Sequence, residues 1–74
     1  MKAFVLITLR EPKERDVLNK LNSMKEIVRA EVLFGEWDMM AEIDIENTDK
    51  LGNFIIENIR TIPEIKLTST LIAA

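Results

Sequence analysis

The sequence predicts one α+β domain over residues 1–74, with its elements in the order β-α-β-β-α-β. Three observations support this prediction. The chain has the length of a single small domain. Its apolar residues switch between strand-like runs and helical spacing. Its two halves also resemble each other, because Ser23–Ile27 (SMKEI) returns 38 positions later as Thr61–Ile65 (TIPEI) and the same shift carries Leu21 onto Ile59.

The first half predicts a strand, a helix and a second strand. Ala3–Leu9 is β-branched and apolar on both alternations, which is typical of a central strand. Pro12 fits the first turn of a helix, since that turn needs no amide donor from its first residue. Asn22 and Ser23 end this helix, and the chain returns as a strand over Ile27–Phe34. The apolar face of the helix is formed by residues at helical spacing: Val17, Leu18, Leu21 and Met24.

The second half repeats this pattern after a turn at Gly35–Asp38. Met39–Ile45 alternates apolar and acidic residues, as a half-buried strand does. Asn47 or Thr48 can cap the next helix. The buried stripe of that helix is Leu51, Ile55, Ile59 and Ile62. Pro63 then stops the helix, and Ile65–Ile72 forms the last strand. This order predicts the ferredoxin-like fold, a four-stranded antiparallel sheet with both helices on one face.

The other face of the predicted sheet is also apolar, although two helices cover only one face. Phe4 and Leu6 lie opposite their neighbours Val5 and Ile7 in the first strand. Later strands repeat this, with Val28, Val32 and Phe34 opposite Ile27 and Leu33, and Ile72 opposite Leu67 and Leu71. Large contiguous apolar patches are rarely left in water. We therefore expect a dimer through the sheets; the alternative is that strand edges and the C-terminal segment fold over the patch.

Composition excludes several classes of function. The chain has no histidine and no cysteine, so zinc sites with nitrogen or sulfur ligands and Ser/His or Cys/His catalysis lack their parts. The net charge of −3, without a basic run, argues against direct binding of nucleic acid. The two glycines, Gly35 and Gly52, are too far apart for a phosphate-binding loop. No signal peptide or membrane span is predicted, and we expect a cytoplasmic protein without cofactor or metal.

Acidic pairs are the remaining candidates for catalysis. Glu36 with Asp38, and Glu42 with Asp44, each lie on one side of a strand. Such pairs on a small sheet are usually solvated surface groups. The loop between the first strand and helix offers Arg10 and Lys13 but no glycine to cradle an anion. An enzyme is therefore not the favoured interpretation.

The turn at Gly35-Glu36-Trp37-Asp38 contains the only tryptophan of the chain. Glycine there can adopt a positive φ, and Asp38 can accept hydrogen bonds from turn amides. One interpretation is a purely structural turn, with Trp37 wedged on the hydrophobic rim. The other is a binding loop, and local residue types alone do not decide between them.

Taken together, these motifs resemble the effector-binding (RAM) domain of the Lrp/AsnC family of feast/famine regulators. That family has a strand ending in Gly-x-aromatic-Asp, then an apolar strand, a helix, Ile-Pro-x-Ile/Val and a Thr-x-Thr strand. This chain has Gly35-Glu36-Trp37-Asp38, Ile62-Pro63-Glu64-Ile65 and Thr68-Ser69-Thr70 in that order. The resemblance covers essentially the whole chain.

The resemblance implies a ferredoxin-like dimer that associates further into rings and binds amino-acid effectors between dimers. On this basis the ligand-binding residues are Gly35, Glu36, Trp37, Asp38, Thr68 and Thr70. Turn amides would take the ligand carboxylate, and Asp38 its ammonium group.

Full regulators of this family carry a DNA-binding helix-turn-helix before this domain, whereas the present sequence begins at the first strand. The resemblance therefore implies a stand-alone module without that DNA-binding unit. Three roles stay open: an amino-acid sensor or store, a partner that co-assembles with full-length Lrp/AsnC regulators, and an assembly that has lost its ligand. We expect the first, with a ligand-free interaction module as the alternative and a small enzyme of this fold last.

Overall fold

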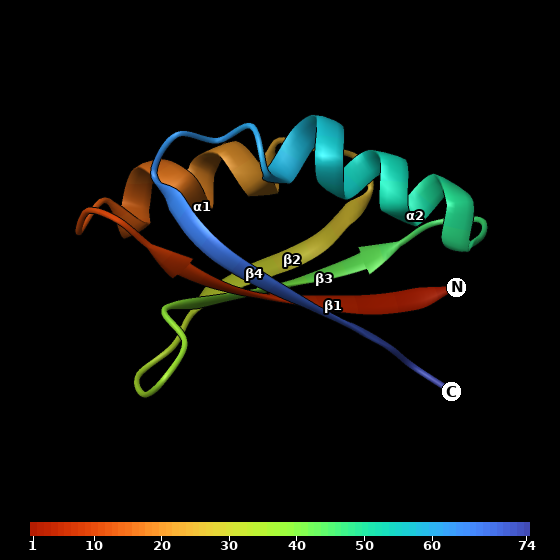
Figure 1. The fold of residues 1–74 in the computed structure, drawn as a ribbon, viewed down its shortest axis with the longest axis horizontal. Coiled ribbons are helices and arrows are strands. Elements are labelled where there is room, and N and C mark those ends of the chain that lie inside the picture. Colours follow the sequence, from red (N-terminus) through yellow and green to blue (C-terminus); the bar gives the residue numbers. More distant parts are fainter.

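The computed structural model describes all residues, 1–74, and has the predicted architecture (Figure 1). Its elements are β1 (Lys2–Leu9), α1 (Glu14–Asn22), β2 (Ile27–Val32), β3 (Met39–Asp44), α2 (Thr48–Phe54), a π-helical turn η1 (Ile55–Ile59) and β4 (Ile65–Ile72). The strands form one antiparallel sheet in the order β2-β3-β1-β4. Both helices lie on one face of this sheet, so the predicted ferredoxin-like fold is confirmed.

The core lies between the sheet and the helices and is entirely hydrophobic. Ala3, Val5 and Ile7 of the central strand β1 are completely buried there. The predicted stripe of the second helix is buried as a whole, and Phe54 joins it. No polar side chain is buried in this layer, so the polar groups of the chain lie outside the core.

The helix ends depart from the prediction in two places. Pro12 lies in the loop before α1, which begins only at Glu14 and has no side-chain cap. The second helix begins as expected, because the Asn47 side chain accepts a hydrogen bond from the Lys50 amide at 2.9 Å. Its last turn is π-helical, with the Arg60 amide donating to the carbonyl of residue 55 at 2.8 Å.

Strand β2 corrects the prediction of its length and of its faces. It ends at Val32, whereas the sequence pattern extended it to Phe34. Its register with β3 shifts between Ile27 and Arg29. Because an extra residue in one strand reverses the alternation of side chains after it, Val32 pairs with Met39 on the same face as Ile27, not on the opposite face.

The sheet face away from the helices is uncovered (Figure 1). Along β1 and β4 it carries what we call the open apolar patch, which Met40 of the neighbouring strand β3 completes; its residues are Phe4, Leu6, Met40, Leu67 and Leu71. Leu67 and Leu71 remain 57% and 52% exposed, while the other three are half-buried. The expectation of a second apolar face is confirmed on this half. The rest of the β2–β3 half is charged instead, around Glu42.

No helix of the structure has the length and apolar character needed to cross a membrane.

Candidate functional site

The segment 33–38 forms a hairpin that extends from one end of the sheet, between β2 and β3 (Figure 1). Gly35 adopts a φ of +132°, as the sequence predicts for this turn. A Cβ atom at Gly35 would meet no atom within 4 Å. Glycine is therefore required by the backbone conformation and not by a lack of space.

Asp38 ties the base of this hairpin to β1. Its amide donates to the carbonyl of Ile7 at 2.9 Å, and its carbonyl accepts from the amide of Leu33 at 2.8 Å. Its carboxylate Oδ2 accepts from the amide of Leu9 at 2.8 Å. The sequence predicted that turn amides would be the donors, and the structure corrects this.

The physical reason is the length of the strand pairing. The β1–β3 ladder ends where Ile7 pairs with Met39, so the amide of Leu9 lies beyond the last backbone partner on that side. A backbone donor without a partner is costly away from water. The Asp38 side chain supplies the missing acceptor and extends the attachment of the hairpin by two residues.

The other side chains of the hairpin are exposed or only half-buried. Trp37 is half-buried, Gly35 and Glu36 are exposed, and Phe34 is completely exposed. The second carboxylate oxygen of Asp38, Oδ1, makes no hydrogen bond within the chain. Neither cavity of the structure is lined by a hairpin residue. The hairpin thus presents acid and amide groups on an open surface and does not enclose a cavity by itself.

Thr68 and Thr70 lie on β4, on the other side of β1 from the hairpin. They pair with Ile7 and Val5 respectively, so both side chains point to the helix-bearing face of the sheet. Thr68 is half-buried and Thr70 is exposed. Neither bonds to a hairpin residue, and the structure does not join the two groups of predicted ligand-binding residues within one chain.

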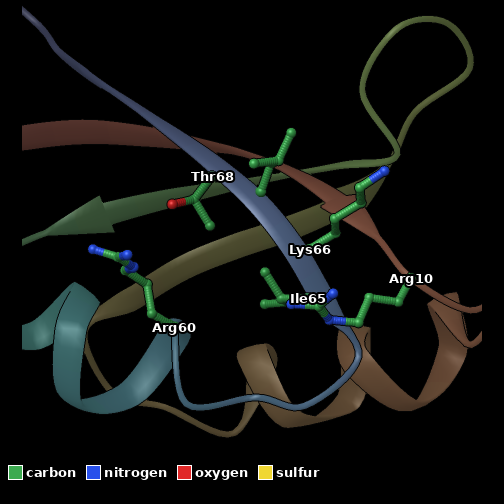
Figure 2. Close-up of a pocket in the computed structure, with 6 residues that line it drawn as sticks. Arg10, Arg60, Ile65, Lys66 and Thr68 are labelled. Atoms are coloured by element: carbon green, nitrogen blue, oxygen red, sulfur yellow. The ribbon is translucent and has the colours of Figure 1, made fainter.

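A cavity of about 350 Å³ lies beside β4, and Thr68 contributes to its wall. It is lined by Arg10, Arg60, Ile65, Lys66, Leu67 and Thr68 (Figure 2). Sequence reasoning considered Arg10 only as part of the loop before α1. It missed the cavity, because three separate segments of the chain form it. The only available signal was the spacing of Arg60 and Lys66 around Pro63.

Comparison with known proteins identifies the family. The model of the Lrp/AsnC ligand binding domain matches residues 2–74. This chain belongs to the Lrp/AsnC family. The Lrp/AsnC domain is 33% identical over 72 residues to the HTH-type transcriptional regulator FL11 of Pyrococcus horikoshii, covering 97% of this chain and 47% of that protein. The chain therefore spans about half the length of the curated relatives it matches.

Solved structures agree with this assignment. The Lrp/AsnC domain superposes on FFRP-DM1 with a TM-score of 0.93 and 41% identity, covering 99% of this chain and 97% of that one. It superposes on Escherichia coli AsnC with a TM-score of 0.90 and 32% identity, covering 97% of this chain and 49% of that one.

Proposed function

We propose that this Lrp/AsnC domain is a non-enzymatic regulatory module of the cytoplasm that binds a free amino acid and assembles through its sheet. The observation that carries the proposal is the state of Asp38 in a domain of this family. One carboxylate oxygen is held by the Leu9 amide, while the other has no partner in the chain. A fixed carboxylate with a free oxygen is suited to accept an ammonium group.

The groups around Asp38 suit the rest of an amino acid. Gly35, with its positive φ, turns the backbone of an exposed hairpin whose amides can donate to a carboxylate. Trp37, half-buried beside Asp38 in the chain, offers an apolar surface to a ligand side chain. A protein of the same fold, the regulator NMB0573 of Neisseria meningitidis, was solved as a complex with L-Met. That complex supports an amino acid as the class of ligand.

The open apolar patch supports assembly with a second copy. Two identical patches facing each other would bury Leu67 and Leu71, which are half exposed in the single chain. The charged half of this face could also be buried in a dimer, because its central carboxylate, Glu42, already has cationic partners. The Glu42 side chain is only 12% exposed and lies between Lys2 at 3.9 Å and Arg29 at 3.6 Å. Because its charge is already paired, contact with another sheet leaves no isolated carboxylate.

Further association of dimers would complete the ligand site. The hairpin forms one wall, and no cavity adjoins it within the chain. A neighbouring dimer would supply the opposite wall, and Thr68 and Thr70 could reach the ligand only from such a copy, because β1 separates them from the hairpin of their own chain. Ligand binding and assembly are then coupled, since each stabilises the arrangement that the other needs.

The deciding experiment is a calorimetric screen of all standard amino acids against the wild-type protein, with assembly followed by light scattering. We expect one class of amino acid to bind at millimolar concentration or below and to change the assembly. Absence of binding by every amino acid would refute the ligand proposal. A well-folded monomer at micromolar concentration would refute the assembly proposal.

A second candidate is an interaction module that co-assembles with full-length Lrp/AsnC regulators without a ligand. It is favoured by the structural use of the Asp38 carboxylate and by the fully exposed Phe34 at the hairpin. Capture of a purified full-length regulator by this domain, together with a negative amino-acid screen, would support it over the sensor.

A further inference from the structure

Three cationic side chains border the cavity beside β4, and no acidic side chain does. Arg10 comes from the residue after β1, Arg60 from the end of the second helix, and Lys66 from β4 (Figure 2). The protein as a whole is acidic, with a net charge of −3. A gathering of positive charge in such a chain needs a physical explanation.

The ion pairs of the protein sharpen this contrast. Five of its ten basic residues lie within 4.0 Å of a carboxylate: Lys2, Lys13, Lys20, Arg29 and Lys50. Arg10, Arg60 and Lys66 have no such partner. Three unpaired cations around one cavity repel one another and raise the local positive potential. An anion in the cavity would relieve this repulsion.

Two backbone irregularities lie next to or at residues that line the same cavity. Arg60 directly follows the π-helical turn, whose closing hydrogen bond runs from its own amide to Ile55. Lys66 is the extra residue of a β-bulge, because the neighbouring residues Thr8 and Leu9 of β1 pair with Leu67 and Ile65. π-Helical turns and β-bulges redirect side chains and are frequent at functional sites. Here the π-helical turn ends one residue before Arg60, and the β-bulge contains Lys66.

The third cation is also positioned by the backbone. The amide of Arg10 donates to the carbonyl of Glu64 at 2.8 Å, which holds the end of β1 against the start of β4. Ile65 is buried and gives the cavity an apolar floor. Thr68 adds a half-buried hydroxyl as a donor or acceptor. Exposed cations at the rim, one hydroxyl and an apolar residue are the parts of a small-molecule anion site.

We propose that this cavity binds a small anion with at least two negative charges, such as a phosphate compound or a dicarboxylate. Arginine side chains bind both groups through paired hydrogen bonds, and lysine adds a point charge. The volume of about 350 Å³ is sufficient for a metabolite of this size. The cavity is separate from the hairpin of its own chain, but it shares Thr68 with the proposed amino-acid site and Leu67 with the open apolar patch. The anion titration below is therefore carried out without amino acid, so that it tests this cavity alone.

The test is calorimetric titration of the wild-type protein with pyrophosphate, glycerol 3-phosphate and succinate at low ionic strength. We expect saturable binding of at least one of them, with one site per chain and weaker binding as salt is added. Preference for the phosphate compounds over succinate, or the reverse, identifies which anionic group the cavity selects.

A charge-matched pair of variants localises the binding. Arg60→Gln/Lys66→Gln removes two cations of the cavity, and we expect the affinity to fall by about tenfold or more. Arg15→Gln/Lys25→Gln removes two exposed, unpaired cations that do not line the cavity, and we expect a change of about twofold or less. Arg10→Gln gives an independent measurement at the third cation. Circular dichroism establishes that each variant is folded.

Three results would overturn the proposal. The first is no binding of any of the three anions by the wild type at millimolar concentration. The second is an equal loss of affinity in both double variants, which would indicate non-specific attraction. The third is a change of assembly in Arg60→Gln/Lys66→Gln in the absence of any anion, because the cavity would then hold an acidic group of another subunit.

Discussion

The carboxylate of Asp38 accepts the backbone amide of Leu9 at 2.8 Å, a bond between residues that are 29 positions apart. It joins the base of the hairpin to the end of the central strand, next to the backbone bond from the Asp38 amide to Ile7. The same side chain that we propose as the ammonium acceptor therefore also holds the hairpin. Because of this double role, we expect Asp38→Ala and Asp38→Asn to have different effects on stability.

We expect Asp38→Ala to destabilise the fold, because it leaves the Leu9 amide without an acceptor; the free energy of unfolding should fall by about 1–3 kcal/mol. Asp38→Asn keeps an acceptor oxygen for Leu9 and removes only the charge. It should unfold close to the wild type but lose amino-acid binding. Urea unfolding and calorimetry of the two variants measure these effects.

Unimpaired amino-acid binding by Asp38→Asn would contradict the ligand-binding role of Asp38 and leave it with a structural role only. Equal loss of stability in both variants would show that the charge of the carboxylate matters for the bond to Leu9.

The two glycines should respond to alanine in opposite directions. Gly35→Ala forces a Cβ into a φ of +132°, and we expect a loss of about 1 kcal/mol or more in unfolding free energy. Gly52→Ala lies within α2 with open space around it, and we expect a gain of roughly 0.5–1 kcal/mol. Thermal unfolding of both variants against wild type provides the measurement. A neutral Gly35→Ala would mean that the hairpin adopts another backbone conformation at little cost.

The open apolar patch predicts where a charge disrupts assembly. Leu71 on the patch and Ile56 on the second helical segment have similar exposure, 52% and 57%. We expect Leu71→Glu to prevent the proposed dimer from forming, because it would bury a carboxylate between two sheets. Ile56→Glu is the matched control and should leave assembly unchanged. Sedimentation velocity at micromolar concentration distinguishes them, and equal behaviour of the two variants would exclude the patch as the interface.

Glu64 should contribute to the pH dependence of stability. Its pKa lies below the usual value, first because its carboxylate is hydrogen-bonded to its own backbone and second because Lys20 donates to it at 3.2 Å. The folded protein therefore binds this proton less readily than the unfolded chain does. The stabilisation is present above the ordinary glutamate pKa of about 4.3 and is lost as the pH falls through the lower folded pKa.

We accordingly expect Glu64→Gln to be less stable than wild type at neutral pH, with the difference shrinking on acidification. Glu57→Gln, at an exposed acid without an ion-pair partner, is the charge-matched control. Urea unfolding at neutral and at acidic pH measures the difference. A gap that stays constant with pH would contradict the assignment.

Much of the fold could be predicted because its determinants are local. The continuous apolar and β-branched run of residues 3–9 predicts a central strand, and the spacing of Leu51, Ile55 and Ile59 predicts a buried helical stripe; both are found. Asn47 could be recognised as a cap from its neighbours alone, since a cap bonds within three residues. With the repeat of the two halves, these signals were sufficient for the βαββαβ order and for both helices on one face.

The faces of individual side chains and the cavity beside β4 could not be predicted, because they depend on strand register. A one-residue bulge changes the register and leaves no signal in the apolar pattern of the sequence. The bulge before Arg29 moved Val32 to the helix-bearing face. The bulge at Lys66 and the π-helical turn before Arg60 lie at two of the cations that line the cavity, and the third, Arg10, comes from the other half of the chain. The chain alone determined that Gly35 would turn a hairpin next to Asp38. Only the tertiary structure placed the Leu9 amide beyond the last strand pair, where that carboxylate was the acceptor within reach.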